Sequence, residues 1–182
     1  LAAGAELYWF VDELPWGMDA WRSGLLMAAS GGTVLLTLAG IRRAIWPLRV
    51  WPQLYGTLAL LPLLPVLILL LVVANLQDAR VIHTLYLPLI NPLEEGAGFA
   101  LLGLWAWSLF AAPRLTHYAS WAPRALLMAQ AGLSFWWLNG LLLRALANYA
   151  GVDWNVEALW HSRLIQTTFA LFWMLGALVV TK

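Results

Sequence analysis

Five stretches of this chain carry no charged residue over at least 18 positions, and this feature limits its fold more than any other. The five runs are Ser23–Ile41, Val50–Gln77, Gly96–Pro113, Ala125–Leu143 and Leu164–Thr181. An α-helix rises about 1.5 Å per residue, so a run of this length can cross a hydrocarbon layer of about 30 Å. Transmembrane strands would alternate apolar and polar residues over about ten positions, and these runs do not. The sequence therefore predicts an all-α, polytopic transmembrane helix bundle of five spans with interfacial segments.

The amino-acid composition agrees with this class. Charged residues make up 10% of the 182 residues and hydrophobic residues 63%, whereas about 25% of an ordinary soluble domain is charged. Too few polar side chains are present to cover a soluble domain of this size. We expect residues 1–182 to form a single membrane-embedded helical domain in contact with the lipid bilayer. The predicted helices lie near residues 22–45, 52–76, 92–112, 123–149 and 154–181.

Basic and acidic residues separate along the chain. The segments after the first, third and fifth predicted helices contain basic residues and no acid: Arg42, Arg43, Arg49, Arg114, Arg124 and Lys182. The acids occur in the segments expected on the opposite side of the membrane: Glu6, Asp12, Glu13, Asp19, Asp78, Glu94, Glu95, Asp153 and Glu157. Short loops rich in arginine and lysine stay cytoplasmic. We expect a bacterial inner (cytoplasmic) membrane protein with its N-terminus periplasmic and its C-terminus cytoplasmic. The net charge of +1 hides this separation and by itself says nothing about nucleic acid, and we expect no nucleic-acid partner.

A polar stretch before the third predicted helix reads YLPLINPLEEG. Asn91 is a good N-cap, and Pro92 suits the first helical position. Glu94, at the third helical position, can bond back toward the amide of the cap, as in a capping box. We expect this stretch to cap the helix and to carry no chemistry. A ligand or proton site at Glu94 and Glu95 is the alternative.

Other features predict local structure. Pro62 and Pro65 predict a kink in the second span, and the small residues of Ala28–Thr33 predict close approach of another helix. The chain is rich in tryptophan, with 13 residues, and most of them fit an aromatic belt at the membrane interfaces. The three histidines are expected on different sides of the membrane, so we expect them to form no metal site. No sequence motif indicates a cofactor.

The best candidate site lies where the fourth and fifth predicted helices meet the outer surface. Helical spacing places Trp137, Arg144 and Asn148 on one face of the fourth helix. The candidate ligand-binding residues are Arg144, Arg163, Gln166, Asn139, His161 and Trp160. Guanidinium groups bind phosphate in a bidentate way, which suits an anionic lipid headgroup or a sugar phosphate. The simpler alternative is that both arginines extend to the headgroups and only anchor their helices.

The short connection between these two helices predicts an antiparallel pair. Arg144, His161, Arg163 and Gln166 would then lie at one depth, with Asp153 in the loop above. Two arginines close together repel, so at least one needs a carboxylate or a bound anion.

Three segments of the C-terminal half carry a resemblance: YLPLINPLEEGAGFALLGLWAW, LNGLLLRALANYAGVDWN and LWHSRLIQTTFALFWMLGAL. They resemble the C-terminal part of a bacterial family of large predicted membrane proteins with many spans, catalogued as domain of unknown function 2339. The matching positions are Pro88, Asn91, Pro92, Asn139, Arg144, Ser162, Arg163 and Gln166. The family supplies a class but no established activity. The lack of an initiating Met and of a signal peptide leads us to expect a fragment of a longer polytopic protein, whose other spans would be its partners.

Two functions fit these observations. The first is a non-enzymatic, transporter-like or scaffolding segment of a large envelope protein, with no catalytic residue. The second is a membrane-embedded enzyme, or a binding site, for a lipid-linked anionic envelope substrate, with Glu94 or Asp153 as the base. An enzyme must bring the carboxylate within about 3 Å of the reacting proton, directly or through one water.

Overall fold

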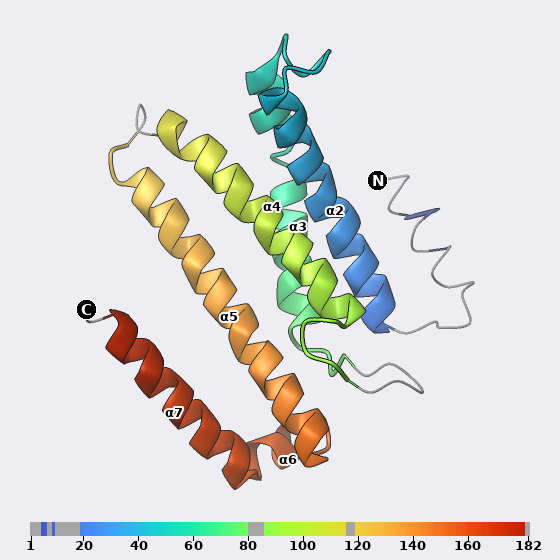
Figure 1. The fold of residues 1–182 in the computed structure, drawn as a ribbon, viewed down its shortest axis with the longest axis vertical. Helices are drawn as coiled ribbons and strands as arrows, with labels where there is room; N and C mark the ends of the chain where they lie inside the picture. Colours follow the sequence, from blue (N-terminus) through green and yellow to red (C-terminus); the bar gives the residue numbers. More distant parts are fainter. Residues whose placement is uncertain (1–4, 7–8, 10–18, 80–85, 116–118, 181–182) are drawn as a thin grey trace.

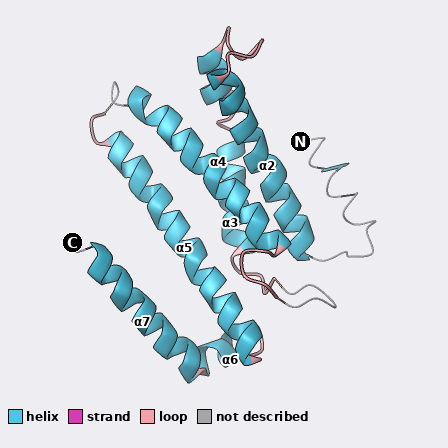
Figure 2. Ribbon diagram, viewed as in Figure 1, coloured by secondary structure: helices cyan, strands magenta, loops and turns pink. Residues whose placement is uncertain are grey.

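The computed structural model describes residues 5–6, 9, 19–79, 86–115 and 119–180, and this part of the chain contains helices and no strand (Figure 2). The elements in chain order are α2 (Asp19–Arg42), the π-helix η1 (Leu54–Leu58), α3 (Leu63–Ala74), α4 (Pro92–Leu115), α5 (Ala122–Ala150), α6 (Val156–His161) and α7 (Arg163–Val180). The predicted all-α fold is confirmed.

Four helical segments of the described part are long and apolar enough to cross a membrane. They are Ala20–Arg42, Leu54–Ala74, Pro92–Leu115 and Ala122–Ala150. The apolar stretch of α7, Arg163–Leu178, is shorter. A helical membrane protein is therefore supported, whereas a fifth span stays a prediction.

The second predicted helix is interrupted rather than continuous. Pro62 and Pro65 lack the backbone N–H that an α-helix needs, and the chain passes through η1 and a turn before α3 begins. In η1 the N–H of Ala59 donates to the carbonyl of Leu54 at 2.9 Å, which is the i→i−5 hydrogen bond of a π-helix. The indole of Trp107, from α4, donates to the carbonyl of Gly56 at 3.1 Å. The regular α-helical hydrogen bonding is therefore interrupted near the prolines, whereas a kink of the helix axis stays a prediction. A neighbouring helix supplies a donor where the regular pattern fails.

The fifth predicted helix, expected from residue 154, is two helices. Asn155 caps α6, because its side chain accepts from the N–H of Ala158 at 2.7 Å. Ser162 is extended, with φ −72° and ψ 110°, so the chain breaks there and α7 begins at Arg163. The first predicted helix also ends early, at Arg42, because Ala44 has a positive φ of 53°. Local backbone geometry, invisible in the hydropathy pattern, sets these ends.

Helices α2 and α4 run side by side in the same direction (Figure 1) and touch through glycines. A Cβ added to Gly96 would lie 2.1 Å from the carbonyl oxygen of Gly24, and one on Gly31 would lie 2.4 Å from that of Phe99. Gly103 follows one repeat later, with its Cβ position 3.0 Å from the Gly31 oxygen. The small-residue stretch Ala28–Thr33 does face another helix, as predicted, through Gly31.

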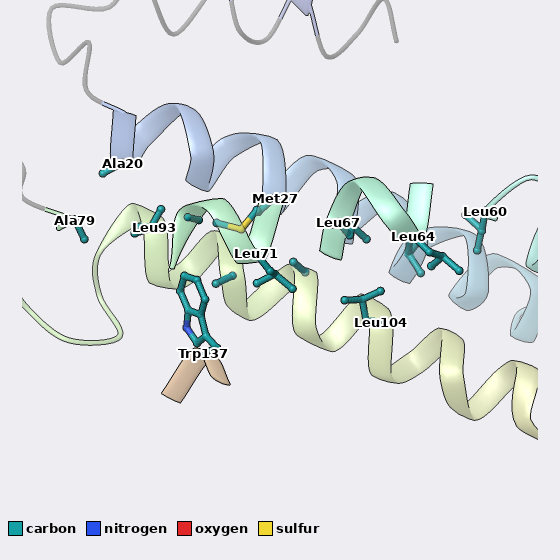
Figure 3. Packing of buried hydrophobic residues seen from close by; sticks show 14 of the residues in the cluster. Ala20, Met27, Leu60, Leu64, Leu67, Leu71, Ala79, Leu93, Leu104 and Trp137 are labelled. Carbon is teal, nitrogen blue, oxygen red and sulfur yellow. The ribbon is translucent and has the colours of Figure 1, made fainter. Parts of the chain in front are cut away.

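The hydrophobic core lies between α2, α3 and α4 (Figure 3). Met27, Leu67, Leu71, Leu93 and Leu104 are almost completely buried there. Helix α5 joins this core mainly through Trp137. The core thus fixes the end of α3 and the start of α4, which contribute to the candidate site.

Helices α5 and α7 run in opposite directions, which confirms the predicted antiparallel pair (Figure 1). The rings of Phe135 and Phe172 stack with centroids 5.7 Å apart. The indole of Trp173 donates to the Asn139 side-chain oxygen at 2.8 Å.

Candidate functional site

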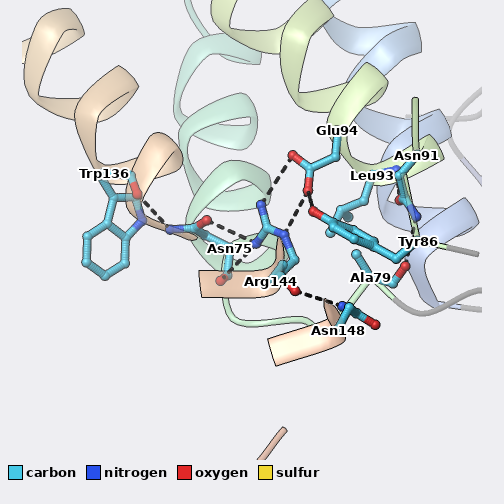
Figure 4. Close-up of polar contacts among 9 residues, drawn as sticks. All are labelled: Asn75, Ala79, Tyr86, Asn91, Leu93, Glu94, Trp136, Arg144 and Asn148. Atoms are coloured by element: carbon cyan, nitrogen blue, oxygen red, sulfur yellow. Dashed lines mark hydrogen bonds and ion pairs between the residues drawn. The ribbon is translucent and has the colours of Figure 1, made fainter. Parts of the chain in front are cut away.

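The most unusual residue of the described chain is Arg144, whose guanidinium is fully buried near the C-terminal end of α5. Figure 4 shows its surroundings, which come from the end of α3, the start of α4 and the segment that precedes α4. A buried charge is strongly unfavourable unless it is paired and hydrogen-bonded. The partners of Arg144 therefore define the site.

The first partner is Glu94, in the first turn of α4. The Nε of Arg144 lies 2.9 Å from Oε1 of Glu94, and Nη2 lies 3.4 Å from Oε2. Both side chains are completely shielded from the surface. This side-by-side geometry is the arrangement in which a guanidinium binds a carboxylate most specifically. The acid also lies in the first turn of α4, at the positive end of the helix dipole.

The second partner is Asn75, which ends α3. Nη1 of Arg144 donates to its backbone oxygen at 3.3 Å and to its side-chain oxygen at 3.2 Å. The amide of Asn75 in turn donates to the carbonyl of Trp136 at 3.1 Å. Space for this side chain exists because residue 140 is glycine, where a Cβ would lie 1.7 Å from the Asn75 oxygen.

The third partner is Tyr86, whose hydroxyl donates to Oε1 of Glu94 at 2.8 Å. Burial, followed by the negative charge of Glu94, raises the pKa of the Tyr86 phenol above its ordinary value. The phenol therefore stays a neutral donor. The hydroxyl of Tyr149 donates to the Tyr86 backbone oxygen at 3.1 Å, which ties this segment to α5.

The face of the Trp137 ring completes the environment of the guanidinium, with Cζ of Arg144 4.6 Å from the ring centroid. Cations over indole rings gain further stabilisation when they are desolvated. Each oxygen of Glu94 accepts at least one hydrogen bond, and the cluster is neutral as a whole. The ion pair joins α5 to α4, and the hydrogen bonds from Arg144 to Asn75 join α5 to the end of α3. The carboxylate is thus occupied by protein donors.

The prediction that Asn91 caps α4 is confirmed, but the predicted bond from Glu94 back to the amide of the cap is wrong. The Asn91 side-chain oxygen accepts from the N–H of Leu93 at 3.0 Å, and its amide donates to the Ala79 carbonyl at 2.8 Å. Glu94 does not return to the cap amide, because Arg144 and Tyr86 hold its carboxylate. A buried cation outcompetes a local backbone donor. That the stretch carries no chemistry stays a prediction.

The structure separates the two arginines of the predicted site. Arg144 points into the bundle, whereas Arg163 is exposed at the start of α7 and pairs with no acid among the described residues. His161 and Trp160 are also exposed. Gln166 donates to the Trp160 carbonyl at 2.5 Å.

Asn139 also has a structural contact. It accepts the bond from the Trp173 indole and donates to the carbonyl of Phe135 at 2.6 Å. Asp153, the other predicted base, is exposed, as are Glu157 and Glu95. Of these four acids, the structure brings Glu94 alone to one of the two arginines.

The sequence reasoning missed Asn75 and Tyr86. The available signal was weak: Asn75 is an amide near the end of an otherwise apolar run, and Tyr86 lies next to the cap. Neither position indicates which helix it contacts.

Comparison with known proteins gives one match. The model of a family described as "Predicted membrane protein (DUF2339)" covers residues 1–181. No curated protein and no solved structure matches the chain.

Proposed function

Because the chain belongs to the DUF2339 family of predicted membrane proteins, we propose that it is a non-enzymatic scaffolding segment of a larger bacterial envelope protein. The observation that carries this proposal is the occupation of Glu94. This acid was the first candidate for a catalytic base, and in the structure both its oxygens accept from Arg144 and one also accepts from Tyr86. A base must reach a substrate proton directly or through one water, and this carboxylate is directed to protein donors instead.

The cluster of Arg144, Glu94, Asn75 and Tyr86 holds three helices in fixed positions. It fixes the end of α3, the start of α4 and the last turns of α5 against one another (Figure 4). Pairing of this kind defines one relative rotation of the helices, because a helix turned away would leave a charge unpaired in an apolar environment. A rigid end is what a scaffold for further spans or domains requires.

The test compares single and paired replacements in the full-length protein. Replacing both members of a buried ion pair by apolar residues is often neutral, whereas removal of one is strongly destabilising. We expect Glu94→Leu and Arg144→Met each to lower the membrane abundance and the melting temperature. The double variant should recover most of both.

Co-purified lipids, measured by mass spectrometry, separate this role from the alternative one. If the double variant is stable but loses an anionic lipid-linked molecule that the native protein retains, the pair serves a ligand and the scaffolding role is wrong. An outer-face site for such a molecule would have to be built on Arg163, because the guanidinium of Arg144 is already occupied. Arg163→Gln with unchanged lipid content would argue against that site as well.

The proposed topology has five spans, with α7 as the fifth, in the bacterial inner membrane. The 18 residues of α7 extend about 27 Å, close to the thickness of a hydrocarbon layer. The chain has no cysteine, so each introduced cysteine is a unique label in this segment. An impermeant thiol reagent added from the periplasm should reach Glu95→Cys but neither Arg43→Cys nor Arg114→Cys. The reverse pattern would invert the orientation.

A further inference from the structure

A group of exposed cations lies at the opposite end of the helices from the Glu94–Arg144 pair, where the chain leaves α2 for η1 (Figure 1). We name residues 42–53 the basic loop. It contains Arg42, Arg43 and Arg49 and no acid. All three side chains are exposed, and none forms an ion pair with a described residue.

The basic loop is folded rather than extended. The N–H of Arg49 donates to the carbonyl of Ile45 at 2.9 Å, and that of Ile45 donates to Gly40 of α2 at 3.0 Å. Leu48 packs back onto α2 at Gly40, where a Cβ would lie 2.3 Å from the leucine Cδ1. One apolar side chain thus faces the bundle and fixes the position of the loop.

The large apolar side chains of the same loop point away from the protein. Trp46 is 73% exposed and Trp51 62%, and Ile45 and Val50 are each 51% exposed. Exposure of this much apolar surface to water is unfavourable by about 25 cal/mol per Å². Arginines and exposed apolar side chains therefore occur together on one short segment.

The loop is also connected to α4. The side-chain oxygen of Gln53 accepts from Nε of Arg114 at 2.8 Å, and the Arg114 guanidinium stacks on Phe110 at 3.8 Å from the ring centroid. An anion bound at the loop would therefore be held next to the ends of two helices.

We propose that the basic loop is a binding surface for anionic phospholipid headgroups. Arg42, Arg43 and Arg49 contact the phosphates, since guanidinium pairs with phosphate in a bidentate way. Trp46 and Trp51 lie in the interfacial layer just below, where indole rings are favoured. A free phosphate or a nucleic acid would match the arginines but would leave the two tryptophans in water. The surface is distinct from the outer-face arginines and does not depend on the scaffolding role.

The experiment measures lipid retention by the full-length protein in detergent, using native mass spectrometry after addition of phosphatidylglycerol or phosphatidylcholine. The native protein should retain phosphatidylglycerol preferentially. Retention should fall as the salt concentration rises from about 50 to about 500 mM, because screening weakens attraction between exposed charges. Equal retention of both lipids, or no dependence on salt, would overturn the proposal without any variant.

Variants locate the surface. Substitution of Arg42, Arg43 and Arg49 by glutamine should lower phosphatidylglycerol retention at least about tenfold, given the attraction of each basic side chain to an anionic membrane surface. Arg124→Gln, which removes a single exposed arginine at the start of α5, is the control for Arg43→Gln and should leave retention unchanged. Equal losses in these two single variants would show a general effect of charge and contradict the assignment.

A second set of variants distinguishes lipid from free anion. Trp46→Ser with Trp51→Ser should also lower phosphatidylglycerol retention, although it leaves every arginine in place. Excess inorganic phosphate should not displace the lipid. Full displacement by phosphate, with no effect of the tryptophan substitutions, would identify a site for small anions and refute the lipid surface.

Discussion

Two contacts between helices in this protein hold the helices together by different interactions. Helices α2 and α4 meet backbone to backbone, with Gly24 opposite Gly96 and Gly31 opposite Phe99 and Gly103. Helix α5 instead meets α3 and α4 through polar side chains around Arg144. Within a bilayer the hydrophobic effect does not drive helices together, so close packing of small residues and interhelical hydrogen bonds must do so.

The two contacts differ in which substitutions they tolerate and in how specifically they select the residue that they contact. The glycine contact depends on shape, and an added methyl group is enough to disturb it. The Arg144 contact depends on charge, and it defines which acid must face the arginine. We infer that the first contact sets how closely the helices approach and that the second sets the position of α5.

The largest expected effect comes from unpairing the arginine. Glu94→Leu leaves Arg144 buried without a counterion, and we expect a loss of about 3 to 5 kcal/mol in the free energy of unfolding. Unfolding in mixed detergent micelles measures this loss. Glu95→Leu is the matched control, because Glu95 is exposed one position along the same helix. A similar loss in the control would mean that the charge near the start of α4, and not the pair, matters.

The glycine contact should be the next most sensitive. A Cβ at residue 96 would lie 2.1 Å from the Gly24 oxygen, so Gly96→Ala must push α2 and α4 apart. We expect a loss of about 1 to 3 kcal/mol, measured by the same unfolding experiment. Gly98→Ala, two positions along on α4, meets no atom within 4 Å and should stabilise the helix by up to about 1 kcal/mol. Equal effects of the two substitutions would contradict the backbone contact.

The cap of α4 should matter less than either contact. Asn91→Ala removes the acceptor for the N–H of Leu93, and we expect a loss of about 1 kcal/mol. Asn91→Ser keeps a side-chain acceptor at this position and should lose less. Should alanine and serine be equally destabilising, the bond from Asn91 to the Ala79 carbonyl would be the important one instead.

The smallest effect is expected at the α5–α7 contact. Asn139→Leu removes the acceptor for the Trp173 indole, and hydrogen bonds between membrane helices contribute about 0.6 kcal/mol on average. A double-mutant cycle with Trp173→Phe isolates this bond. A coupling energy as large as that of the Glu94–Arg144 pair would show instead that α7 is bound to α5 as strongly as α5 is bound to α4.

The amino-acid sequence by itself determined the fold class and the approximate course of the helices. Charge-free runs of sufficient length can only be helices in a bilayer, where every backbone polar group must be bonded internally. The start of α4 at Pro92 and the extent of α5 followed from local signals, the cap and the apolar run. The break near Pro62 followed from the missing N–H of proline.

Only the tertiary structure decided which residues meet. Arg144 and Glu94 lie 50 positions apart, and their pairing depends on the rotation and register of α4 and α5 about their own axes. Helical periodicity defines the face on which each residue lies but not the helix that this face contacts. For the same reason the sequence placed Arg144 beside Arg163, on the helix next along the chain, whereas the core of α2, α3 and α4 offers the buried carboxylate that a desolvated guanidinium requires.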